Sequence, residues 1–346
     1  MNKLSENIFI TQEIGSFRKP DYLSKKFHTI EGQNEFYELA RKATVETIDL
    51  FEKAGLENLG VGGEMFRWEM YEHLASNVGG LEFYGMVRSF DNRYYRKGSV
   101  VSEITRKNPF HVDELEYLLS QTKGKLKVPI TGPYTMMDWS FNEYYKDRYE
   151  TAMEFAKLLN EDMKELKKEW DKKYPGKKFE IQLDEPATTT HPDEMNIVVD
   201  SLNKSVEGIE NVEFTIHVCY SRDYNLLYDV MNDIKIDGLN LEFANRDTLE
   251  SGISDDKRPG FNDLKYFNER NDGKKFMGLG VTDVHIDYVE PVKLIEDRIN
   301  YALKILPPDL IRLNPDCGLR TRSREIGYAK LKNMDIAKQE ILKEIQ

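Results

Sequence analysis

The sequence predicts an α/β fold, a single (β/α)₈ barrel over residues 1–346. Short apolar or β-branched runs alternate with longer amphipathic stretches along the chain, which is typical of βα units on a parallel sheet. Eight of the short runs have the length of a strand, and polar residues cluster at their carboxyl ends, where barrel enzymes carry their active sites. A doubly wound sheet shows a similar alternation, but the eight strands favour the barrel.

Each expected strand is a short run of apolar or β-branched residues. In chain order these runs are IFITQEIGS (8–16), ENLGVGGE (57–64), KVPITGP (127–133), FEIQLDEP (179–186), EFTIHVC (213–219), GLNLEF (238–243), KFMGLGV (275–281) and LIRLNPDC (310–317). Helices are expected where apolar residues recur every three or four positions. These stretches are 34–55, 148–174, 225–233, 289–306 and 328–345.

The connection after the second expected strand, residues 65–126, is much longer than an ordinary βα loop. It contains one helical stretch and then an aromatic, Arg-rich stretch. Long connections in compact domains are often functional. We therefore expect this insertion to form a hairpin over the mouth of the barrel.

Composition and charge exclude several classes of protein. The chain is 40% hydrophobic and 32% charged, as globular proteins are, and its formal net charge of −12 opposes nucleic-acid binding. No apolar run approaches the roughly 20 residues of a membrane helix, and MNKLSENIFITQEIG lacks an apolar signal segment. We expect a cytoplasmic protein whose two cysteines serve metal binding or catalysis rather than a disulfide framework.

The two cysteines lie at the ends of two expected strands. Cys219 ends EFTIHVC with His217 two residues before it, Cys317 ends LIRLNPDC, and Glu242 stands near the end of GLNLEF. Residues two apart on a strand point to the same face, and Zn²⁺ takes thiolate, imidazole and carboxylate ligands in tetrahedral geometry. A core histidine beside a small buried thiol is the alternative. The shared location at strand ends favours zinc.

Other polar residues stand at the same expected edge: Gly15-Ser16, Glu64, Thr131-Gly132-Pro133, Asp184-Glu185-Pro186, Asp283 with His285, and Asp316. Two thiolates, one carboxylate and one imidazole around Zn²⁺ give a complex of net charge about −1. Such a site suits a bound nucleophile. A substrate thiol could replace the weakest ligand, Glu242, and lose its proton at neutral pH.

At these residues the sequence resembles the catalytic, C-terminal half of cobalamin-independent methionine synthase. The matching motifs run in order over nearly the whole chain: EIGSF (13–17), GGEMFRWEM (62–70), TGPYTMMDWSF (131–141), QLDEPA (182–187), IHVCY (216–220), LEFANRD (241–247), GLGVTDVHIDYV (278–289) and NPDCGLRTR (314–322). The combination of H-x-C, Glu and NPDCGL is highly specific. The resemblance implies a zinc-dependent methyltransferase that makes methionine from homocysteine, with zinc held by His217, Cys219, Glu242 and Cys317.

The resemblance also implies how homocysteine is held. The backbone around Ile14, Gly15 and Ser16 would take its carboxylate, and Glu64 and Asp184 its ammonium group. Charge-assisted hydrogen bonds of these kinds suit both ends of an amino acid. Without the resemblance, Glu64 reads equally well as a helix-start acid and Asp184 as a loop cap.

Two more residues take roles from the resemblance. His285 matches the family's active-site histidine and would manage the proton during methyl transfer. Trp139 matches an aromatic residue that stacks on the pterin ring of the methyl donor, although a large aromatic at this place is equally often part of the core.

The sequence departs from the family's full-length members in two places. They carry a second, N-terminal barrel that helps to hold the folate tail, and they have an Arg-Glu pair where this chain has Thr188-Thr189-Thr190. Both departures remove folate contacts. We therefore expect 5-methyltetrahydrofolate, a related pterin or a methylated corrinoid protein as donor, with a partner subunit as one way to replace the missing barrel.

Two alternatives remain open from the sequence. One is a zinc methyltransferase that acts on another thiol such as coenzyme M, although EIGS and GGE favour an amino-acid substrate. The other is a non-catalytic zinc-binding or partner-regulating subunit. A closed structural zinc site would not need the additional acids at the strand ends.

Overall fold

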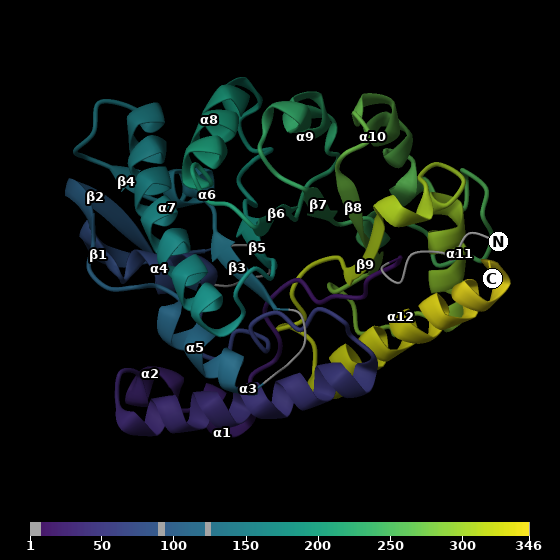
Figure 1. Ribbon diagram of the computed structural model, residues 1–346, viewed down its shortest axis with the longest axis horizontal. Coiled ribbons are helices and arrows are strands. Elements are labelled where there is room, and N and C mark those ends of the chain that lie inside the picture. Colours follow the sequence, from purple (N-terminus) through teal and green to yellow (C-terminus); the bar gives the residue numbers. More distant parts are fainter. Residues whose placement is uncertain (1–7, 89–93, 122–125, 346) are drawn as a thin grey trace.

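Six parallel strands form the central sheet of the computed structural model, which describes residues 8–88, 94–121 and 126–345 (Figure 1). In spatial order the strands are β3 (Lys127–Thr131), β5 (Phe179–Asp184), β6 (Val212–Val218), β7 (Gly238–Leu241), β8 (Phe276–Thr282) and β9 (Ile311–Pro315). Nearly every residue of these strands is buried, as expected for a parallel sheet that is covered on both faces. The α/β barrel-type fold is thereby confirmed.

The first two expected strands are not regular strands in the structure. Residues 8–16 lie beside β9 through a single bridge from Thr11 to Leu313, and residues 57–64 are joined to them by one bridge from Gln12 to Asn58. The prediction of eight ladder-forming strands is therefore wrong for these two segments. The sheet continues past β9 through isolated backbone contacts.

Side chains inside the barrel hold the N-terminal segment in place. Gln12 donates to Asn240 Oδ1 of β7 across the interior at 2.8 Å, and Asn240 donates to Gln182 Oε1 of β5 at 2.9 Å. Gln182 in turn donates to the backbone carbonyl of Ile14 at 2.9 Å. Arg67, which follows residues 57–64, donates from Nη1 to the Pro129 carbonyl of β3 at 2.6 Å. These side-chain hydrogen bonds substitute for part of the missing backbone ladder.

Helices alternate with the strands and surround the sheet (Figure 1). The longer ones are α3 (Asn34–Ala54), α7 (Arg148–Lys173), α8 (Met195–Ser205), α11 (Val292–Ala302) and α12 (Arg324–Ile345). The shorter ones are α1 (Asp21–Ser24), α2 (Phe27–Ile30), α4 (Met70–Ala75), α5 (Val112–Gln121), α6 (Pro133–Asp138), α9 (Asn225–Val230) and α10 (Leu264–Arg270). The helices expected at 34–55 and 148–174 are confirmed.

Three other helix predictions need adjustment. The stretch 225–233 forms α9 followed by a 3₁₀ turn, Met231–Asp233. Helix α11 begins only at Val292, because Pro291 occupies its N-cap position, and α12 begins four residues before the expected start. Helices α1, α2, α6, α8 and α10 were not predicted.

Local sequence explains where α7 begins and where α3 ends. Asp147 precedes α7 and its side chain accepts the Glu150 N–H at 2.9 Å, which satisfies one of the unpaired donors of the first turn. Gly55 ends α3 in a left-handed conformation with φ +93°, which a residue with a side chain rarely adopts.

The long connection at residues 65–126 forms the predicted helix and hairpin. After α4, strands β1 (Val78–Arg88) and β2 (Tyr94–Arg106) pair antiparallel, and β2 pairs with β4 (Phe141–Asn142) in a separate three-stranded sheet (Figure 1). Residues 89–93 and 122–125 of this connection lie outside the described residues. No described helix is long and apolar enough to cross a lipid bilayer.

Candidate active site and metal cluster

Three of the four predicted metal ligands converge at the carboxyl ends of the strands. His217 is in β6, Cys219 follows it, and Cys317 follows β9. One ligand atom of each residue lies within 4.8 Å of the others, and His217 and Cys219 are buried. Both thiols are free. The set offers one imidazole nitrogen and two sulfurs, a donor combination that zinc favours.

The imidazole of His217 is oriented for metal binding. Its Nδ1 lies 2.8 Å from the Asn240 carbonyl oxygen, so Nδ1 carries the proton and donates to that carbonyl. Nε2 is buried and makes no protein hydrogen bond of good geometry within the described chain. A histidine ligand is usually held in this way, with one nitrogen on a carbonyl and the other on the metal. The cluster therefore fits a divalent cation.

The electrostatics of the cluster favour a thiolate. The Cys219 thiol donates to Cys317 and, with His217, holds the pKa of Cys317 well below its usual value although burial opposes this. Burial also opposes the charged form of His217, but the Cys317 sulfur and Asp184 outweigh it and raise the pKa of His217 to about 9. A cation that binds here would replace this proton as the counter-charge of the sulfur.

Glu242, the fourth predicted ligand, lies beside the cluster but outside the compact set. Its Oε2 accepts the Tyr220 N–H at 2.6 Å and an Asn245 amide hydrogen at 3.0 Å. Its Oε1 lies 3.2 Å from Nε2 of His285. The carboxylate is fully buried and is held by neighbouring loops rather than by the thiols.

His285 lies on the loop after β8 and faces the same cavity. Its backbone N–H donates to Asp283 Oδ1 at 2.7 Å, and its ring contacts the Tyr220 ring edge to face at 5.0 Å. Burial lowers the stability of its charged form, but Glu242 more than offsets this and raises the pKa of His285 to about 9. The side chain can therefore hold a proton next to the cluster.

The predicted amino-acid-binding residues line the same cavity as the cluster. This cavity holds about 880 Å³ of free space including its open mouth, and Ile14, Gly15, Ser16, Glu64 and Asp184 all contribute to its wall. Burial raises the pKa of Asp184 to about 7, although His217 opposes the shift. The cavity wall therefore combines acids, backbone groups and soft metal ligands in one place.

Gly15 is required by the close approach of Glu64. A Cβ at Gly15 would lie 2.6 Å from Glu64 Oε1 and 3.2 Å from the Pro129 ring. Glu64 itself has φ +60°, a left-handed conformation that is uncommon for a residue with a side chain. The strained backbone directs the Glu64 carboxylate against Gly15.

Trp139 closes another side of the cavity together with the hairpin. It follows α6, and its ring lies 5.3 Å from the ring of Tyr95 in β2 with the two planes 31° apart. Tyr94 and Tyr95 line the cavity as well. The sequence predicted a hairpin over the mouth but did not identify these two tyrosines, because a residue's place over a distant site is not encoded in its local pattern.

Glu69, Tyr220 and Arg320 also line the cavity and were not singled out from the sequence. Each belongs to a motif quoted above: Glu69 to GGEMFRWEM, Tyr220 to IHVCY and Arg320 to NPDCGLRTR. Burial raises the pKa of Glu69 to about 7. Their positions within these motifs were the only indication in the sequence that they lie near the site.

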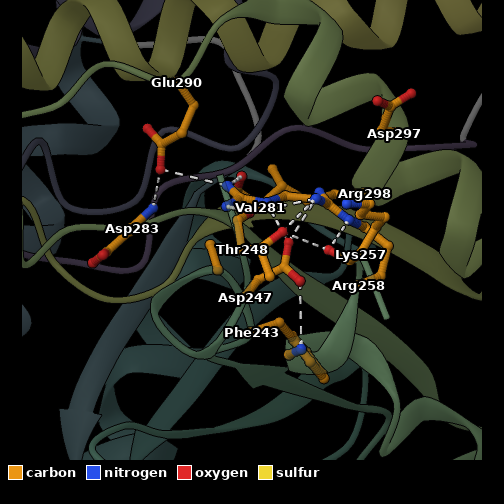
Figure 2. A network of polar contacts seen from close by, with 12 residues as sticks. Phe243, Asp247, Thr248, Lys257, Arg258, Val281, Asp283, Glu290, Asp297 and Arg298 are labelled. Carbon is orange, nitrogen blue, oxygen red and sulfur yellow. Dashed lines mark hydrogen bonds and ion pairs between the residues drawn. The ribbon is translucent and has the colours of Figure 1, made fainter. Parts of the chain in front are cut away.

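A buried network of ion pairs supports the loop that carries His285 (Figure 2). Asp247 Oδ2 lies 3.0 Å from both Arg258 Nη1 and Arg298 Nε, and Arg298 Nη1 donates to the Val281 carbonyl of β8 at 2.9 Å. Glu290 Oε1 accepts the Asp283 N–H at 2.6 Å, next to the bond that Asp283 makes to His285. These ion pairs and hydrogen bonds hold the carboxyl end of β8 and the residue that follows it.

The fold and the site together define a class of protein. It is an α/β barrel-type enzyme with a His/Cys/Cys cluster, an acid and a histidine in one cavity at the carboxyl ends of its strands. Residues 9–339 match the model of a protein family described as the catalytic domain of cobalamin-independent synthase.

Relatives of similar length support the same assignment. A protein from Thermoplasma acidophilum named methionine synthase is 65% identical over 340 residues, which cover 97% of this chain and 99% of the relative. Another of that name from Thermococcus kodakarensis is 38% identical, covering 97% and 96%. The chain belongs to the cobalamin-independent methionine synthase family and is a methyltransferase.

Solved structures show the same fold. A B12-independent methionine synthase from a Shewanella species, in complex with selenomethionine, has a TM-score of 0.81 at 24% identity, covering 98% of this chain and 99% of that one. A putative vitamin-B12-independent methionine synthase from Listeria monocytogenes has a TM-score of 0.73 at 17% identity, with the same coverage. Both support the barrel-type fold.

Proposed function

We propose that the protein is a zinc-dependent homocysteine S-methyltransferase that forms methionine. The observation that carries this proposal is that His217, Cys219 and Cys317 lie in the same cavity as the residues predicted to bind the amino acid. Family membership supports the reaction type, and the donor set supports the metal.

His217 Nε2 and the sulfurs of Cys219 and Cys317 would hold the zinc, with Glu242 as a fourth ligand that turns from its present hydrogen bonds. A bound zinc ion acts as a Lewis acid and lowers the pKa of a substrate thiol, so that the thiolate is available near neutral pH. The Asn240 carbonyl keeps His217 in the required tautomer.

The residues at the cavity wall would position homocysteine. Backbone groups around Ile14, Gly15 and Ser16 take its carboxylate, while Glu64 and Asp184 take its ammonium group through charge-assisted hydrogen bonds. This fixes the two charged ends of the substrate and leaves its sulfur next to the cluster, so that the reacting atoms are already oriented.

The methyl donor would enter from the side of Trp139 and the hairpin. Trp139, Tyr94 and Tyr95 give an aromatic wall against which a flat ring can stack. The sulfur–methyl bond forms as the donor's nitrogen–methyl or cobalt–methyl bond breaks, and the electron pair of the broken bond stays on the nitrogen or the cobalt. The thiol proton leaves to solvent when the thiolate forms, and protonated His285 would give a proton to the leaving nitrogen of a pterin donor. The donor is 5-methyltetrahydrofolate, a related pterin or a methylated corrinoid protein. A partner subunit and a cytoplasmic location stay predictions.

The test is methionine formation by the zinc-loaded protein from homocysteine, with a methylated pterin or methylcobalamin offered as donor. We expect activity with at least one of them. His217→Ala and Cys317→Ser should lose both activity and zinc. Full activity of metal-free protein would refute the proposal, and so would turnover of coenzyme M in preference to homocysteine.

A further inference from the structure

A second pocket adjoins the catalytic cavity and has a different character. Its wall includes Arg18, Lys19, Lys25, Trp68, Arg320 and Thr321, and we call these six residues the basic pocket. Arg320 and Thr321 also line the catalytic cavity. The two spaces are therefore neighbours.

The basic pocket carries a positive charge that the protein as a whole does not. The chain has a net charge of −12, yet four cations line this space. The acid in the same wall, Asp21, is already paired with Lys25 at 2.6 Å. The lining thus holds four basic side chains and one acid.

The cations are close enough to affect one another. Burial and the charge of Arg320 lower the pKa of Lys19 to about 7. An anion placed among these groups would relieve the repulsion and favour the charged form of Lys19. The pocket therefore has the electrostatics of an anion site.

The backbone ties the basic pocket to the proposed homocysteine site. Residues 17–25 directly follow Ile14–Ser16, and Lys19 Nζ donates to the Glu64 carbonyl at 3.0 Å. Arg320 lies three residues after Cys317. The homocysteine carboxylate is already assigned to Ile14–Ser16, so an anion in the basic pocket would belong to the other substrate.

We propose that the basic pocket binds an anionic group, a carboxylate or a phosphate, on the distal part of the methyl donor. This rests on the proposed function. Two sources fit the chemistry: the glutamate carboxylates on a pterin tail, or the phosphodiester in the nucleotide loop of a corrinoid. Trp68 gives the pocket an aromatic wall against which the linking part of the donor can lie.

The test uses pairs of donors that differ in the anion. One pair is methyltetrahydropteroyl triglutamate and its monoglutamate, and the other is methylcobalamin and methylcobinamide, which lacks the phosphodiester. The variant Arg18→Gln/Lys25→Gln removes two exposed cations of the pocket. The control Lys42→Gln/Lys53→Gln removes two exposed cations of α3. Calorimetry on zinc-loaded protein without homocysteine gives the dissociation constants of the donors, and turnover with homocysteine is measured in parallel.

We expect the pocket variant to bind the more anionic member of one pair about 10-fold more weakly. Its affinity for the less anionic member and the affinities of the control should stay within about 2-fold of wild type. The pair that responds identifies the source of the anion. Equal affinities of wild type and variant for all four donors, or an equal loss within both pairs, would overturn the inference. If the variant bound one donor more weakly but no protein formed methionine, the result would refute the proposed function and would still support the basic pocket as an anion site.

Discussion

The carboxylate of Glu290 joins the backbone N–H of Asp283, 2.6 Å away, to the ammonium of Lys330 at 2.7 Å. Glu290 and Lys330 are fully buried. Asp283 in turn accepts the N–H of His285. The loop that carries the proposed proton-handling residue is thus anchored to a buried ion pair. Figure 2 shows the contact between Asp283 and Glu290.

Glu290→Gln should destabilise the protein strongly. The neutral amide leaves the Lys330 ammonium buried without a counter-charge, which costs about 3–5 kcal/mol in the free energy of unfolding. The control is Glu340→Gln, which breaks an exposed pair with Lys343 and should cost at most about 1 kcal/mol. Urea denaturation of both variants compares the two costs, and similar values would contradict the role given to the network.

Gly15→Ala should weaken homocysteine binding while the fold survives. The new methyl group meets Glu64 Oε1 at 2.6 Å and pushes the carboxylate away from the substrate ammonium, so KM for homocysteine should rise about 10-fold or more. Gly85→Ala is the matched control, because a Cβ there meets no atom within 4 Å. Steady-state kinetics gives KM for homocysteine in both variants. An unchanged KM in Gly15→Ala would show that Glu64 does not hold the substrate.

Trp139→Ala should raise KM for a pterin donor while KM for homocysteine stays near wild type. Loss of a stacking surface of this size costs about 1–2 kcal/mol, or roughly 5- to 30-fold in KM. Trp139→Phe should recover part of the loss because it keeps an aromatic face. If the alanine variant used the donor as well as wild type does, Trp139 would be a packing residue only.

Lys19 should make stability depend on pH above neutrality. Its pKa is 10.5 for a free side chain and about 7 in the folded protein, chiefly because of burial. Between these values the unfolded chain holds a proton that the folded chain lacks, so stability rises with pH from about 7 to 10.5. Wild type should gain about 2 kcal/mol more than Lys19→Met between pH 7 and 9. Urea unfolding at the two pH values measures the difference, and parallel changes in both proteins would refute it.

The core of the site could be predicted because it follows from strand geometry. His217 and Cys219 share a face through the two-residue period of β6, and Cys317 follows β9 at the same edge of the parallel sheet. The side chain of Glu242 could not be placed in this way. Its orientation depends on hydrogen bonds from Tyr220, Asn245 and His285, which come from three loops.

The fold class could also be predicted, but the regularity of its first two segments could not. Residues 8–16 and 57–64 have the apolar pattern of strands, yet Gln12 is held by a side-chain bond through the barrel interior, and the two segments make only isolated bridges. An apolar sequence pattern indicates that a segment is buried, but it does not show whether its backbone forms a regular ladder of hydrogen bonds. The tyrosines of the hairpin were missed for the same reason, because their place depends on an insertion that folds back over the site.

The most direct test of the central claim is X-ray absorption at the zinc edge, with and without homocysteine. We predict a tetrahedral shell of one nitrogen and two sulfurs with one oxygen, and a third sulfur in place of the oxygen after homocysteine is added. A protein that retains no zinc, or a zinc shell that homocysteine leaves unchanged, would contradict the account.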